Sequence, residues 1–204
     1  MLNKYARWVV QAPLEMLARK LHAANITPNM VSVAGFILTL LSALIIANGA
    51  FIIGAIVYSV AAINDMLDGT LARLTQSSTF GAFLDSTLDR YSESITCFGL
   101  MYFFMTQPGR ETELVLVFLM LVGSLMVSYT RARAEGLNVE CKAGLLQRPE
   151  RVVLLIAGLL LPGLLVPTLW VLAIFSNFTA LQRIYEVYIR TSQAQINVPP
   201  HKEA

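Results

Sequence analysis

The sequence is poor in charge and in cysteine, and each shortage excludes a class of protein. Only 14% of its 204 residues are charged, against about a quarter in an average soluble domain. This composition excludes a disordered chain, and a net charge of +2 gives no reason to expect a nucleic-acid partner. Two cysteines, Cys97 and Cys141, are too few for a disulfide framework or a zinc site. No signal peptide is expected, because charges interrupt the N-terminal residues.

What the sequence has instead is long apolar segments, which make 56% of the chain hydrophobic. A helix needs about 20 mostly apolar residues to cross a bilayer. We therefore predict an all-α polytopic membrane protein with six transmembrane helices. The apolar segments that predict them are 30–48, 51–63 with its polar continuation, 80–105, 114–129, 152–161 and 168–180.

The N-terminal residues 1–29 have a different pattern. Leu14, Leu17, Ala18 and Leu21 recur at helical spacing among charged residues, which is typical of an amphipathic helix in the membrane interface. A soluble helix packed on the bundle is the alternative. We expect a six-helix domain at 30–190 and a flexible polar tail at 191–204.

Positive residues predict the orientation. With six crossings, the lysines and arginines near both ends and in two of the connections share one side, and only Arg110 lies on the other. Because positive loops face the cytoplasm, both termini and the functional site should be cytoplasmic, in a multi-pass protein of the cell membrane.

Four carboxylates form the most informative pattern. Asp65 and Asp68 are three residues apart, and Asp85 and Asp89 are four apart, so each pair shares a helix face. A short turn between the two helices makes them antiparallel, so the carboxylates should converge. Oxygen ligands without His or Cys favour Mg²⁺, Mn²⁺ or Ca²⁺, and a pair of such ions is a known device for phosphoryl transfer.

The spacing alone leaves two other interpretations open. Arg73 and Arg90 could neutralise carboxylates in a purely structural network, and intramembrane carboxylates also mark ion paths, as in a divalent-cation carrier. Small residues favour a ligand site, because Gly69 and Gly81 lie on the carboxylate face and leave room beside it.

The full pattern, Asp65-x-x-Asp68-Gly69-x-x-Ala72-Arg73 followed by Gly81-x-x-x-Asp85-x-x-x-Asp89, resembles the signature of the CDP-alcohol phosphatidyltransferases. The resemblance implies an enzyme with a six-helix membrane fold, two Mg²⁺ ions per site with Mn²⁺ as a substitute, and a homodimer. It implies that all four aspartates bind metal and that Asp89 is the general base. It also implies contacts to the CDP-lipid from Asn29, Met30, Val31, Ser32, Gly69, Arg73 and Ser78.

Arginines further along the chain indicate the acceptor. Arg131, Arg151 and Arg183 belong to three different helices at one expected depth, and guanidinium groups grip phosphate bidentately. Contact with lipid headgroups is the alternative. The blocks around them resemble bacterial phosphatidylinositol phosphate synthases, which implies transfer from CDP-diacylglycerol to inositol phosphate. These three arginines would then hold the acceptor phosphate, with Arg133 and Arg148 as secondary candidates and glycerol phosphate as the rival acceptor.

Overall fold

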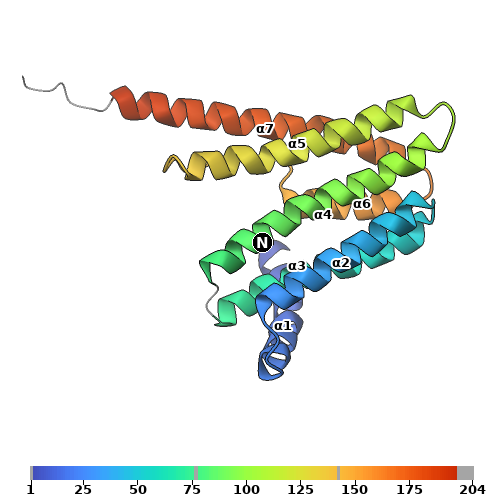
Figure 1. The fold of residues 1–204 in the computed structure, drawn as a ribbon. Coiled ribbons are helices and arrows are strands. Elements are labelled where there is room, and N and C mark those ends of the chain that lie inside the picture. Colours follow the sequence, from blue (N-terminus) through green and yellow to red (C-terminus); the bar gives the residue numbers. More distant parts are fainter. Residues whose placement is uncertain (1, 76–77, 142, 197–204) are drawn as a thin grey trace, which may run out of the picture. The chain divides into compact units, whose positions relative to one another are not determined.

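The computed structural model describes residues 2–75, 78–141 and 143–196, with side chains for 12–75, 78–141 and 143–192. Within these ranges every regular element is a helix, which confirms the predicted all-α class (Figure 1). The helices are α1 (Leu2–Ala23), α2 (Pro28–Ala47), α3 (Phe51–Thr75), α4 (Thr79–Met105), α5 (Glu111–Glu135), α6 (Arg148–Leu160) and α7 (Leu165–Ile196).

The chain divides into two compact units. The first comprises Met1–Pro108 with Leu159–Pro162, and the second comprises Gly109–Gly158 with Gly163–Ala204. The first unit therefore holds α1 to α4 and all four predicted metal-binding aspartates, whereas the second holds α5, α7, most of α6 and the predicted arginine cluster. The domain boundaries expected from the sequence, at residues 29 and 190, do not coincide with the limits of these two units and stay a prediction.

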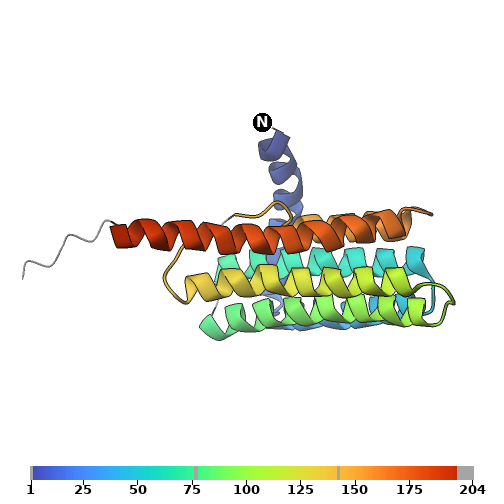
Figure 2. The same ribbon diagram turned by 90° about the horizontal axis from the view of Figure 1, so that it is seen from above.

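Short capped connections make α2, α3 and α4 run in alternating directions, as Figures 1 and 2 show. Thr27 caps α2 by accepting the Met30 N–H at 3.4 Å, and Pro28 occupies the first turn, where its missing N–H costs nothing. Gly49, with φ of 80°, makes the turn into α3. Ser78 caps α4 by accepting the Gly81 N–H at 2.9 Å.

The packing of α2 against α3 and α4 reaches backbone contact. A Cβ added to Gly99 would lie 2.5 Å from the Ala43 carbonyl oxygen, and one added to Gly54 would lie 2.5 Å from the Ile46 side chain. The Ser42 hydroxyl donates to the Gly54 carbonyl oxygen at 2.8 Å. Such close approach is typical of helices that pack through small residues.

The α1 helix packs on α3 and runs across the direction of α2–α4 in both views (Figures 1 and 2). Ala18 is fully buried against Val31, Leu67 and Leu71. Leu14 and Leu21 pack against the same cluster, as their spacing suggested, whereas Leu17 is 44% exposed.

A left-handed residue ends α1 in a defined turn. The Ile26 N–H donates to the Leu21 carbonyl oxygen and the Asn25 N–H donates to the His22 carbonyl oxygen, both at 3.0 Å. Asn25 has a φ of 59°. This pair of bonds is the Schellman arrangement, and Leu21 and Ile26 supply its usual apolar contact.

The second unit is built on α5 and α7, which pack along each other. The Asn177 amide, on α7, donates to the Leu119 carbonyl oxygen of α5 at 2.9 Å. Gly123 of α5 makes this approach possible, because an added Cβ would lie 2.8 Å from Asn177. Before α6, the Leu146 N–H donates to the Thr179 hydroxyl at 3.1 Å, which ties the connection to α7.

Four helices in the described part of the chain are long and apolar enough to cross a membrane: α2, α3, α5 and the Leu165–Ser192 portion of α7. The α4 helix is long, but it contains Asp85, Asp89, Arg90 and Glu93, and α6 has only 13 residues. The predicted multi-pass character is thus supported, while the number six and the interfacial place of α1 stay predictions. The α7 helix continues to Ile196, beyond the expected start of the tail at 191, and residues 197–204 lie outside the described part.

Candidate metal centre and nucleotide cavity

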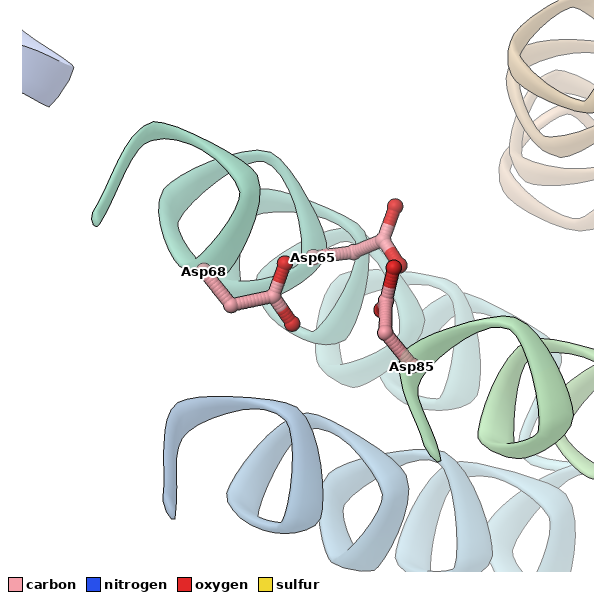
Figure 3. Close-up of side chains that lie close together, drawn as sticks. All are labelled: Asp65, Asp68 and Asp85. Carbon is pink, nitrogen blue, oxygen red and sulfur yellow. The ribbon is translucent and has the colours of Figure 1, made fainter. Parts of the chain in front are cut away.

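Three of the four aspartates meet between α3 and α4. Asp65 and Asp68 come from α3 and Asp85 from α4, and each offers a carboxylate oxygen within 4.8 Å of those of the other two (Figure 3). Asp68 is buried, at 4% exposure, and the other two are half-buried. Three hard oxygen donors at this separation suit a divalent cation, since without one the like charges repel each other.

Asp89 lies outside this group, one helical turn after Asp85 on α4. Its side chain is 14% exposed, and one of its oxygens, Oδ2, lies 3.7 Å from Nη1 of the neighbouring Arg90. The sequence pattern placed four carboxylates together, and the structure gathers three with the fourth next along the helix. Asp89 therefore lies next to the group of three carboxylates and not within it.

Ser32 and Gly69 support the buried carboxylate. The Ser32 hydroxyl lies 3.1 Å from the Pro28 carbonyl oxygen and is also in hydrogen-bonding contact with the Asp68 carboxylate. The Gly69 backbone N–H contacts the same carboxylate. Asp68 is therefore held in place by both α2 and its own helix.

A cavity of about 650 Å³ opens beside the carboxylates within the first unit. Asp68 and Asp85 form part of its wall, and the rest comes from the ends of all four helices of the unit. The residues that line it are His22, Asn25, Ile26, Thr27, Pro28, Asn29, Ser32, Asp68, Gly69, Ala72, Arg73, Thr75, Ser78, Gly81, Ala82 and Asp85.

Five of the seven residues predicted to contact the CDP-lipid line this cavity: Asn29, Ser32, Gly69, Arg73 and Ser78. The other two side chains lie elsewhere. Met30 is 57% exposed, and Val31 is buried in the apolar cluster under α1.

The two signature glycines have different surroundings. A Cβ added to Gly69 would meet only the Arg73 guanidinium, at 3.9 Å, so the space beside it is open to a ligand. A Cβ added to Gly81 would lie 2.9 Å from Asn29 Oδ1 and 3.1 Å from Ser78 Oγ. Gly81 therefore also allows the start of α2 to approach α4, a role that sequence spacing did not indicate.

The predicted acceptor arginines lie in the second unit. Arg151 and Arg183 are 5% and 4% exposed, and the charges of Arg131 and Arg151 both act on the Arg183 guanidinium. Arg183 donates to the Ala143 carbonyl oxygen at 2.9 Å and to the Val127 carbonyl oxygen at 2.5 Å. Arg151 donates to the Leu146 carbonyl oxygen at 3.2 Å. Two of the three arginines thus also hold the backbone around them.

The remaining arginines are more exposed. Arg131 has a 51% exposed side chain and forms an ion pair with Glu135 at 2.8 Å. Arg133 is exposed and Arg148 is half-buried. These three are therefore less deeply buried than Arg151 and Arg183.

Sequence reasoning did not predict the part of the cavity wall at the end of α1. His22, Asn25 and Ile26 line the cavity. The signal that could have found them is local: an Asn followed by an apolar residue predicts a left-handed helix end that turns the chain sharply.

Comparison with known proteins agrees with the site. A family model described as CDP-alcohol phosphatidyltransferase matches residues 25–181. An archaetidylinositol phosphate synthase of Pyrococcus horikoshii is 38% identical over 188 residues, which cover 91% of this chain and 96% of that protein. A phosphatidylinositol phosphate synthase of Mycobacteroides abscessus is 33% identical over 196 residues, which cover 92% and 88%.

Solved structures give the same result. The crystal structure of Mycobacterium tuberculosis phosphatidylinositol phosphate synthase with CDP-DAG bound has a TM-score of 0.80 at 30% identity, and the match covers 86% of this chain and 93% of that one. The same enzyme in complex with manganese and citrate also gives 0.80 at 30% identity, with 86% and 88% covered. Sequence and fold together show that this chain belongs to the CDP-alcohol phosphatidyltransferase family, the membrane transferases of phospholipid biosynthesis.

Proposed function

We propose that the protein transfers a phosphatidyl group from CDP-diacylglycerol to inositol phosphate, giving phosphatidylinositol phosphate and CMP. The observation that carries this is the group of three carboxylates, two of which line a cavity large enough for a nucleotide. The relatives' names support the acceptor, since both archaetidylinositol phosphate synthase and phosphatidylinositol phosphate synthase denote an inositol phosphate product.

In this proposal Asp65, Asp68, Asp85 and Asp89 hold two Mg²⁺ ions. The donor set fits, because three of its oxygens already lie within 4.8 Å of one another. When bound, the ions supply charge neutralisation for a diphosphate and make the nucleotide a better leaving group. The manganese complex of the Mycobacterium tuberculosis enzyme supports a divalent ion at the family's site.

The donor nucleotide occupies the cavity of the first unit. Arg73 lines it and is exposed, with Nη2 donating to the Thr70 hydroxyl at 3.0 Å, which leaves further N–H groups of the guanidinium for phosphate oxygens. Gly69 leaves space for the nucleotide beside the carboxylates. The Ser32 and Ser78 hydroxyls and the Asn29 amide supply polar contacts in the same wall.

Asp89 is the proposed general base. It takes the proton of one acceptor hydroxyl, and the resulting oxygen forms a bond to the phosphorus that carries diacylglycerol. The bond from that phosphorus to the CMP oxygen breaks, and CMP leaves with the electron pair. Asp89 is a suitable base, because it lies next to the carboxylate group without being part of its closest contacts.

Arg131, Arg151 and Arg183 bind the acceptor phosphate, with Arg133 and Arg148 nearby on the same helices. The charges of Arg131 and Arg151 both act on the Arg183 guanidinium, and guanidinium groups bind phosphate bidentately, which supports this assignment. The proposal further includes a homodimer in the cell membrane, six crossings, and termini and active site on the cytoplasmic face. The crosswise direction of α1 (Figure 2) supports its place in the membrane interface.

The deciding experiment measures CMP release by the purified protein with CDP-diacylglycerol and Mg²⁺. The acceptors are inositol phosphate, glycerol 3-phosphate, inositol and serine, each tested with diacyl and ether-linked donors. We expect turnover with inositol phosphate and little with the others. Faster turnover with glycerol 3-phosphate would replace the proposed acceptor.

The role of Asp89 has its own test. Asp89→Asn cannot accept a proton, so we expect CMP release to fall below detection while the CDP-lipid still binds. Near wild-type turnover of this variant would rule out Asp89 as the base.

A further inference from the structure

One part of the cavity wall has no role in the proposed transfer reaction. His22 and Asn25 line it from the end of α1. Neither residue belongs to the aspartate signature or to the 29–32 segment at the start of α2. His22 is exposed, so its imidazole is available to a ligand.

The position of His22 is fixed by the turn that follows it. Its carbonyl oxygen accepts the Asn25 N–H at 3.0 Å, inside the Schellman arrangement that ends α1. Leu21 and Ile26, on either side of His22 and Asn25, pack on the buried cluster of Ala18, Val31, Leu67 and Leu71. The residue is therefore presented from a rigid support, as a binding residue should be.

The start of α2 leads from this turn toward the carboxylates, because Ser32, about one helical turn after Asn29, contacts the Asp68 carboxylate. Asn29, which follows it, lies beside Ser78 and Gly81, and Ser78 precedes Asp85 by seven residues on or next to α4. That separation is about 10 Å along a helix, which is close to the length of a nucleoside. A donor whose diphosphate lies at the aspartates would place its nucleoside against the α1–α2 turn.

The chemistry of His22 suits this place. Among the described residues that line the cavity, His22 and Arg73 are the only two whose side chains can carry positive charge. Arg73 is on α3, the helix that carries Asp65 and Asp68, whereas His22 comes from α1. An imidazole ring offers one donor, one acceptor and a flat face, which match the edge and face of a pyrimidine base.

We infer that His22 is a specificity-determining residue that contacts the nucleoside of the donor, with Asn25 beside it in the same wall. The inference rests on the proposed donor site and deepens it. His22 takes no part in proton transfer. It sets the affinity for the nucleotide and leaves the acceptor site unaffected.

The test is CMP binding to the detergent-solubilised protein in Mg²⁺, measured by titration calorimetry. We expect His22→Ala to bind CMP about tenfold more weakly, the loss expected for one or two hydrogen bonds. His22→Gln, which can still donate and accept, should recover most of the affinity. Lys20→Ala is the matched control, because Lys20 is exposed on the same helix and does not line the cavity.

Kinetics locate the contact on the nucleoside. His22→Ala should raise KM for the CDP-lipid by the same factor and leave KM for the acceptor unchanged. Inorganic pyrophosphate should inhibit this variant as strongly as it inhibits the wild type. Equal CMP affinity in His22→Ala and wild type would overturn the inference alone, as would a matching loss of pyrophosphate inhibition. A wild-type protein that binds no CMP would overturn the proposed donor site and the inference with it.

Discussion

The two groups of charged side chains differ in what they do for the fold. The aspartates of the first unit gather like charges at the wall of a cavity. Arg183 of the second unit is buried and donates to two backbone carbonyl oxygens. Mutual repulsion makes the first group a cost that a bound cation removes, whereas the second group stabilises the structure before any ligand arrives. A cluster of charged side chains can therefore serve ligand binding alone, or it can serve both ligand binding and the stability of the fold.

The largest effect that tests this contrast is expected from Asp85→Asn. Turnover should fall by more than about a hundredfold, since residues that only support metal ligands already cost about 10- to 100-fold. In metal-free buffer the melting temperature should stay equal or rise, because one of three repelling carboxylates is gone. CMP release measures turnover, and thermal unfolding with and without Mg²⁺ measures the melting temperature. A lower melting temperature of the variant without metal would contradict the comparison.

Arg183→Ala should show the opposite behaviour. It leaves the Val127 and Ala143 carbonyl oxygens without their donor, at a cost of about 1–3 kcal/mol for each buried group. We expect a lower melting temperature together with a higher KM for inositol phosphate. Arg131→Ala is the control: its exposed pair with Glu135 contributes little, so KM should rise without loss of stability.

Gly69→Ala and Gly81→Ala distinguish a glycine that leaves space for a ligand from a glycine that lets two helices approach each other. Gly69→Ala should keep or slightly raise the melting temperature, because alanine favours helix by about 1 kcal/mol and meets open space. It should still raise KM for the CDP-lipid several-fold. Gly81→Ala should lower both stability and donor affinity, because the new methyl group displaces Asn29. Identical behaviour of the two variants would contradict this distinction.

The smallest effect concerns Cys141, in the connection before α6. Burial, followed by the neighbouring Glu186 carboxylate, raises the pKa of this thiol, and its exposure is 2%. Thiolate is the reactive form, so iodoacetamide at pH 8 should modify Cys141 much more slowly in the folded protein than in detergent-denatured protein. Because the folded-state pKa is raised, the stability that the neutral thiol contributes is lost as pH rises through that pKa. Rapid labelling of the folded protein, read by mass spectrometry, would show that this packing is open.

Much of the first unit could be predicted from the sequence. Apolar runs and charge spacing gave an all-helical chain. The i, i+3 spacing of Asp65 and Asp68, with a short turn that makes the helix of Asp85 antiparallel, was enough to predict that these three carboxylates converge. The family signature excluded the purely structural network and left the divalent-cation carrier without support, since family membership makes the chain an enzyme. These features depend on local periodicity, which a sequence states directly.

Other features depend on contacts between distant segments and could not be predicted. Nothing in the sequence indicates that the Arg183 guanidinium donates to the carbonyl oxygens of Val127 and Ala143, which are 56 and 40 positions away. The wall at His22 required knowledge that α1 turns back toward α3 and α4. Met30 and Val31 were assigned by their place in a motif, and the helix phase points their side chains away from the cavity.

The backbone contact of α2 with its two neighbours has a mechanical consequence. Where Gly99 meets Ala43 and Gly54 meets Ile46, even one added methyl group would overlap the neighbouring helix, so these three helices are packed without spare room. The Arg73 side chain, by contrast, is exposed at the cavity. Reacting atoms must align within a fraction of an ångström, and here they are positioned against a closely packed group of helices.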